Sequence, residues 1–143
     1  MHMKRASGSF EVNVQPLANA AFSNAFSNEE GSADPLLGRF LLTKKFSGDL
    51  DAKARGHMLS AGTSVKGSAG YVAIDQVTGT LQGRKGSFVL QHSGSMKRGA
   101  PTLSVMVVPD SGTGELAGLT GTLSINIVEG KHFYDFLYSF PAS

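Results

Sequence analysis

Cysteine is absent from this 143-residue chain. Without thiols, a disulfide framework, a thiolate nucleophile and a cysteine-ligated zinc site are all excluded. The absence of cysteine is also typical of proteins that work in a reducing compartment, so we expect a cytoplasmic location.

Long apolar runs are lacking too. No stretch reaches the roughly 18 consecutive apolar residues that a membrane-spanning helix needs. The N-terminus, MHMKRASGSFEV, has no apolar core of a secretory signal and leads directly into a strand pattern. We therefore expect neither a membrane segment nor a secretory signal.

Concentrated charge of one sign is missing as well. The formal net charge is only +2, and the basic pairs Lys44-Lys45, Arg84-Lys85 and Lys97-Arg98 are scattered along the chain. A nucleic-acid-binding surface is normally a clustered basic patch. These pairs fall at predicted strand ends or turns, so we interpret them as solvated charges and expect no nucleic-acid partner.

Glycine, by contrast, is abundant, with 18 residues that mostly separate segments of alternating apolar and polar side chains. This pattern is typical of β-strands joined by tight turns. It predicts eight strands, at residues 7–14, 38–46, 49–61, 69–82, 87–96, 101–109, 119–128 and 131–140. Residues 16–35 form a long connection, with one short helical turn at Phe22 and Phe26 as the alternative.

The predicted fold class is all-β, with residues 1–143 as a single domain. Consecutive antiparallel strands with short turns form a meander, and eight strands favour a closed barrel because closure removes both sheet edges. The interior of such a barrel is just wide enough for side chains or one small ligand. A β-sandwich is the alternative, although only residues 16–35 are long enough for its crossover.

Residues 70–96 are predicted to form one long β-hairpin with its turn at 83–86. Pairing Gln82 with Ser87 places Asp75 opposite Gly94, so that His92 becomes a diagonal neighbour of Asp75 on the same face. The more apolar face, which we assign to the interior, carries Tyr71, Ala73, Asp75, Val77, Leu81, Phe88, Leu90, His92 and Met96.

Asp75, His92 and Tyr71 are the candidate catalytic residues. A carboxylate on an apolar face is costly unless it is paired, and a carboxylate can orient an imidazole for general base catalysis. Tyr71 on the same face can donate a hydrogen bond to a developing oxyanion. The alternative is a polar pair that only fixes the strand register.

The remaining histidines do not predict a metal site. The alternation of His57 with Leu59 and Ala61 allows it to face the same cavity, and His132 is interpreted as a residue of the barrel rim. Metal-ligand spacing of the usual kind is missing, so we expect no metal and no cofactor.

Five segments resemble a known family: GDL at 48–50, GHMLSA at 56–61, the hairpin run at 67–96, VVPDSGTGELAGLTG at 107–121 and GKHFYDFLY at 130–138. Together they are similar to a bacterial domain-of-unknown-function family of small proteins, classed with the allene-oxide-cyclase-like barrels. The resemblance covers roughly residues 38–140 and implies a closed eight-stranded antiparallel barrel. It implies no function; plant allene oxide cyclase, which closes an unstable fatty-acid epoxide without a cofactor, is an analogy of fold alone.

Three functions stay open. The first is binding of a small hydrophobic molecule in the barrel interior, with contacts from Tyr71, Val77, Leu90, His92 and Met96. The second is a cofactor-free isomerase or cyclase that uses Asp75 and His92 as its acid–base pair. The third is a filled, oligomeric barrel with a structural role.

A homo-oligomer is expected from the last predicted strand. Tyr134, Phe136, Tyr138 and Phe140 alternate with Phe133, so one aromatic face is predicted to lie outside the barrel.

Overall fold

The computed structural model describes residues 2–17 and 37–141. Eight long strands make up nearly all of this part, and the one helical element is a 3-10 turn, η2 (Gly114–Leu116). The strands are β1 (Lys4–Pro16), β2 (Leu37–Gly48), β3 (Leu50–Gly62), β4 (Ala69–Leu81), β5 (Arg84–Lys97), β6 (Ala100–Val107), β7 (Thr120–Val128) and β8 (Lys131–Ser139). The helical turn proposed at Phe22 and Phe26 lies outside the described residues.

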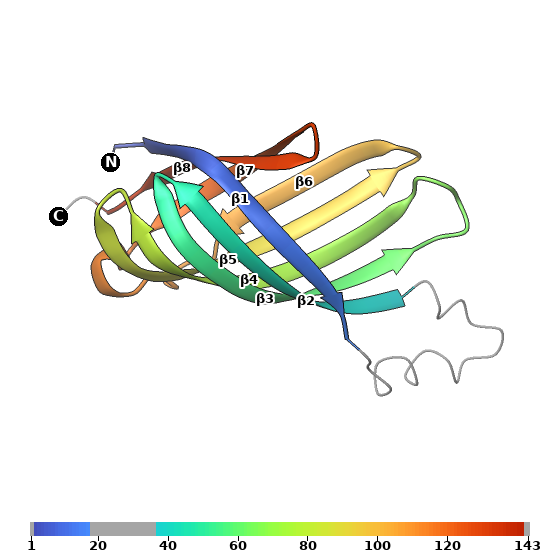
Figure 1. Cartoon of the computed structure of the whole chain (residues 1–143), viewed down its shortest axis with the longest axis horizontal. Coiled ribbons are helices and arrows are strands. Elements are labelled where there is room, and N and C mark those ends of the chain that lie inside the picture. Colours follow the sequence, from blue (N-terminus) through green and yellow to red (C-terminus); the bar gives the residue numbers. More distant parts are fainter. Residues whose placement is uncertain (1, 18–36, 142–143) are drawn as a thin grey trace.

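The strands close into an antiparallel barrel in chain order, β1 to β8, with β8 pairing back onto β1 (Figure 1). The predicted meander barrel is therefore confirmed, and the alternative sandwich is wrong. The seam between β6 and β7 is the weakest in the barrel, because Met106 with Thr122 is its only ladder pair among the described residues.

The predicted register of the β4–β5 hairpin is wrong by four residues. The turn consists of two residues, Gln82 and Gly83, whose φ angles of 44° and 88° are those of a type I′ turn. Leu81 consequently pairs with Arg84, and Asp75 lies opposite Leu90 rather than Gly94. Because four is an even number, the same side chains still face the interior.

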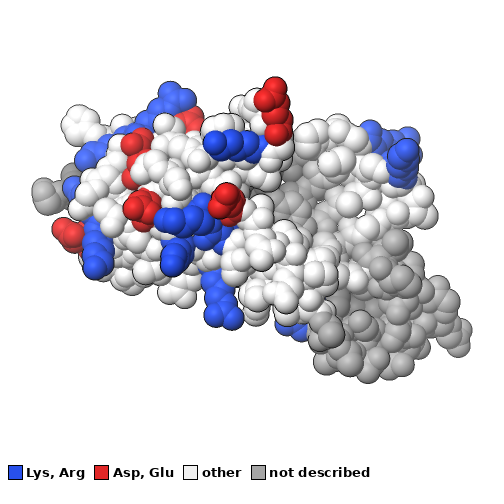
Figure 2. Space-filling view, in the orientation of Figure 1, with Lys and Arg blue, Asp and Glu red and all other residues white. Residues whose placement is uncertain are grey.

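One end of the barrel, which we call the packed end, is filled by side chains. It carries the β2–β3 and β4–β5 turns and the connection 108–119. Its buried side chains include Phe46, Leu50, Leu81, Phe88, Leu116, Leu119, Phe136 and Tyr138. Figure 2 shows charged side chains mainly over the left and centre of this face of the molecule; the packed end lies at the left.

The opposite end, which we call the open end, carries the β3–β4 and β5–β6 turns, at the right in Figure 1, and the β7–β8 turn, near its top centre. Four apolar side chains there alternate in phase with the core residues of their own strands, which places them on the inner face, yet they keep about half of their surface exposed. They are Val14 (46 %), Met96 (43 %), Leu103 (43 %) and Ile127 (60 %).

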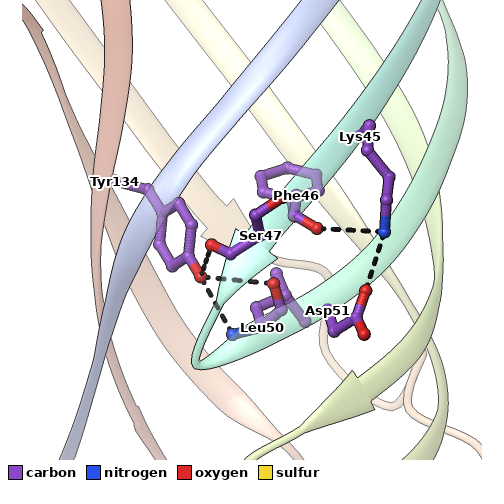
Figure 3. A network of polar contacts seen from close by, with 6 residues as sticks. All are labelled: Lys45, Phe46, Ser47, Leu50, Asp51 and Tyr134. Carbon is purple, nitrogen blue, oxygen red and sulfur yellow. Dashed lines mark hydrogen bonds and ion pairs between the residues drawn. The ribbon is translucent and has the colours of Figure 1, made fainter.

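Tyr134 of β8 ties the last strand to the β2–β3 turn (Figure 3). Its hydroxyl accepts a hydrogen bond from the Leu50 N–H at 2.9 Å and donates to the Ser47 carbonyl at 2.9 Å. The face of β8 that carries Tyr134, Phe136 and Tyr138 is thus the core face. That aromatic face gives no support for a subunit interface, so the homo-oligomer stays a prediction.

No helix in the described part of the chain is long and apolar enough to cross a membrane. The expected cytoplasmic location stays a prediction.

Candidate functional site

Three polar side chains meet inside the barrel: Lys44 of β2, Asp75 of β4 and His92 of β5. Asp75 Oδ2 lies 2.6 Å from Lys44 Nζ and 2.8 Å from His92 Nε2, and the two nitrogens are 3.4 Å apart. Their side chains are 0 % (Asp75), 4 % (His92) and 7 % (Lys44) exposed. We call these three residues the polar cluster.

Small residues on β3 make room for the cluster. Lys44 and Asp75 lie on strands that flank β3, where Ala54 is the partner of Lys44 and Gly56 is the partner of Asp75. A Cβ at Gly56 would stand 2.3 Å from Asp75 Oδ1 and 2.1 Å from the Ile74 carbonyl oxygen. Larger side chains at these two positions would therefore block the path from Lys44 to the carboxylate.

Asp75 is held as a carboxylate. Burial raises its pKa, but the hydrogen bond from His92 and the charge and hydrogen bond of Lys44 outweigh burial, and the net pKa is lowered from its ordinary value. The second oxygen, Oδ1, is buried and has no hydrogen-bond partner among the described residues. The carboxylate therefore depends on Lys44 and His92 for its stabilisation.

Tyr71 lies next to the cluster, on the side of the open end. It is half-buried, and its ring crosses β5 at Gly94, where a Cβ would stand 2.3 Å from Tyr71 Cε1. Burial, and then the negative charge of Asp75, raise the pKa of the phenol. The hydroxyl consequently stays protonated near neutral pH, as a hydrogen-bond donor.

The predicted ligand contacts separate into two groups. Val77 and Leu90 have no exposed surface and belong to the hydrophobic core beneath the cluster. Met96, 43 % exposed, is at the open end. The structure therefore brings Asp75 and His92 into contact, keeps Tyr71 beside them and separates Met96 from the cluster.

Lys44 was missed by sequence reasoning, and its interpretation as a solvated charge is wrong. Its neighbour Lys45 does fit that interpretation, with an exposed ion pair to Asp51 at 2.7 Å. The available signal was alternation, because Lys44 lies between Leu42 and Phe46, which both face the core. A lysine flanked by core residues at i−2 and i+2 points inward.

His57 does not face the interior. It is exposed on the outer face of β3 and lines outer grooves with Ile74, so the expectation that it shares the cavity is wrong. His132, interpreted as a rim residue, is partly buried at the start of β8, with its ring 5.1 Å from that of Phe10. The described residues contain no group of three or more His, Cys, Asp or Glu side chains that could hold a metal ion.

Comparison with known proteins gives a family and a fold. Residues 6–138 match the family model described as a protein of unknown function, DUF3224. The crystal structure of a DUF3224-family protein with unknown function from Shewanella oneidensis MR-1 is 48 % identical in sequence and superposes with a TM-score of 0.85. The match covers 99 % of this chain and 100 % of that one. A search of curated proteins found no match.

Proposed function

The chain belongs to the DUF3224 family, and we propose that it binds a small hydrophobic molecule in the open end of its barrel. The observation that carries this proposal is the exposure of inward-facing apolar side chains. Val14, Met96, Leu103 and Ile127 come from four different strands, and each keeps at least 43 % of its surface exposed. Inward-facing apolar side chains lose this exposure in a filled barrel, so their surface is available to a ligand.

The polar cluster supports a neutral ligand. Lys44 carries one positive charge and Asp75 one negative charge at 2.6 Å, so the two charges compensate each other. Binding in this site therefore does not require a charged ligand to neutralise Lys44 or Asp75. An apolar molecule with one polar group fits this arrangement, because its polar group can hydrogen-bond with Tyr71 or His92 while apolar walls bury the rest.

The side chains that fill the packed end limit how far a ligand can enter the barrel. Val77 and Leu90 have no exposed surface, which makes them a supporting floor rather than contact residues. The contacts proposed are therefore Tyr71, His92 and the apolar side chains of the open end. Access is supported by the β6–β7 seam, where the described residues contain a single ladder pair.

Binding can be tested in two steps. Native mass spectrometry of protein purified from the cells that make it should reveal a co-purifying small molecule at fixed stoichiometry. Titration with the neutral dye Nile red then compares Leu103→Arg with the matched control Val72→Arg, which lies on the outer face and is 51 % exposed. We expect at least a tenfold loss of affinity for Leu103→Arg alone, because a charge at the open end opposes entry of an apolar ligand. Equal behaviour of the two variants would show that the dye binds elsewhere and would refute the proposal.

A further inference from the structure

Of the two ring nitrogens of His92, only Nε2 contacts the other two residues of the polar cluster. Nε2 lies 2.8 Å from Asp75 Oδ2 and 3.4 Å from Lys44 Nζ. A carboxylate only accepts hydrogen bonds and an ammonium only donates them, so the closer carboxylate requires Nε2 to carry the proton. In the neutral ring Nδ1 then bears the lone pair, and no hydrogen bond joins Nδ1 to any of the described residues.

A histidine with one ring nitrogen held in this way can act as a general base through its other ring nitrogen. An imidazole whose N–H is held by a buried carboxylate is fixed in orientation, and the carboxylate stabilises the imidazolium that forms when the other nitrogen takes a proton. Lys44 in turn donates to the same carboxylate oxygen at 2.6 Å. Lys44 and Asp75 are thus positioning residues for His92.

Tyr71 supplies the complementary group. Tyr71 pairs with Gly94, so His92, two residues away on β5, is its diagonal neighbour on the inner face. A carbonyl group bound between them would have a hydrogen-bond donor at its oxygen and a base at its α-carbon. The surrounding apolar side chains, such as Val105, favour a substrate without charge.

We propose that His92 Nδ1 removes the α-proton of a hydrophobic ketone bound in the open end of the barrel, while the Tyr71 hydroxyl donates a hydrogen bond to the enolate oxygen. The C–H bond breaks, its electron pair forms the enolate, and the proton resides on Nδ1. The proton returns to the same carbon or, in an unsaturated ketone, to a conjugated carbon. Atoms and electrons balance without a co-reactant. This assignment rests on the proposed function, because it needs the ketone to bind.

Deuterium exchange into phenylacetone, an uncharged aromatic ketone, tests the assignment. The full-length protein is incubated with the ketone in D₂O, and uptake at the α-carbon is followed by mass spectrometry. We expect His92→Gln to lower the protein-catalysed rate about 100-fold or more. The matched control is His57→Gln, which alters an exposed histidine on the outer face and should leave the rate unchanged.

Two further measurements separate the possible failures. Saturation-transfer NMR measures binding of phenylacetone independently of exchange. Bound ketone with equal exchange rates in the native protein and His92→Gln would overturn the base assignment while leaving the proposed function intact. No bound ketone would count against both.

The tautomer of His92 can be measured in the native protein, so this test does not depend on whether a variant folds. Long-range ¹H–¹⁵N correlation spectra should show the neutral form of the His92 ring protonated at Nε2 and unprotonated at Nδ1. Asp75→Asn should alter this tautomer and slow exchange together, because its effect acts through His92. A neutral ring that carries its proton on Nδ1 would overturn the assignment.

Discussion

Replacing Lys44 with methionine removes the positive charge of the polar cluster but keeps most of the apolar volume of the side chain. Asp75 then retains only His92 as a partner, and its Oδ1 already has none among the described residues. Breaking a buried ion pair from one side typically costs about 3–5 kcal/mol, because an uncompensated charge is left behind. For a protein whose whole stability is of the order of 5–15 kcal/mol, the loss would be large.

The assay is urea denaturation of the native protein and Lys44→Met, followed by circular dichroism. With an m value of about 2 kcal/mol/M, a loss of about 3–5 kcal/mol lowers the midpoint by about 1.5–2.5 M. The matched control is Lys45→Met, which removes the adjacent lysine and its exposed ion pair. Its midpoint should stay close to that of the native protein, because solvent screens an exposed pair.

The effect of Lys44→Met on the unfolding free energy should depend on pH, because it acts through the charge of Asp75. In the native protein the pKa of Asp75 is lowered, so its contribution to stability is present above the unfolded-state pKa of about 4 and is lost as the pH falls through the folded-state pKa. In Lys44→Met, burial is no longer offset by the lysine, and we expect the folded-state pKa to lie above the unfolded-state value. Protonation of Asp75 then restores stability to the variant as the pH falls.

The difference in unfolding free energy between the native protein and Lys44→Met should therefore shrink from pH 7 to pH 4. Adding Asp75→Asn to Lys44→Met should also recover part of the loss at pH 7, because no buried charge remains. A difference below about 1 kcal/mol, or one that grows at low pH, would refute the view that Lys44 stabilises a buried carboxylate.

Two other predictions concern the walls of the barrel. Gly56→Ala should lower the unfolding free energy by about 1–3 kcal/mol, because its Cβ would meet Asp75 Oδ1 at 2.3 Å. Gly70→Ala is the tolerated control in the same denaturation experiment, since its nearest neighbour would be 3.7 Å away. The predicted homo-oligomer should use the apolar outer face of β4, where Ile74 is 50 % exposed. Light scattering should then show a smaller assembly for Ile74→Lys than for the native protein. A monomeric native protein would contradict the predicted homo-oligomer.

Alternation and turn residues were enough to predict the strands and the inner face of the β4–β5 hairpin, but the faces of His57 and Lys44 were assigned wrongly. Each predicted strand corresponds to one observed strand, because glycine-containing turns punctuate a period-two pattern along most of the chain. The error in the hairpin register came from choosing residues 83–86 as the turn. Gln82 adopts a positive φ of 44°, a conformation that is uncommon for a residue other than glycine and that the sequence did not signal.

The placement of Asp75 and His92 on one face survived that error for a physical reason. Side chains repeat every two residues along a strand, so a register shift of four leaves each of them on its original face. His92 remains a diagonal neighbour of Asp75, now on the other side of its cross-strand partner. A shift by an odd number would have placed the two residues on opposite faces.

The sequence by itself thus determined which residues form strands and, in the β4–β5 hairpin, which of them face inward, because both properties depend on local alternation. Only the tertiary structure decided what those inward-facing residues meet. Lys44 reaches Asp75 across β3 because the pairing of β2 and β4 with β3 places the small residues Ala54 and Gly56 between them. The difference between a packed end and an open end likewise depends on how eight strands and the connection 108–119 fill a shared interior, a property that no single strand carries.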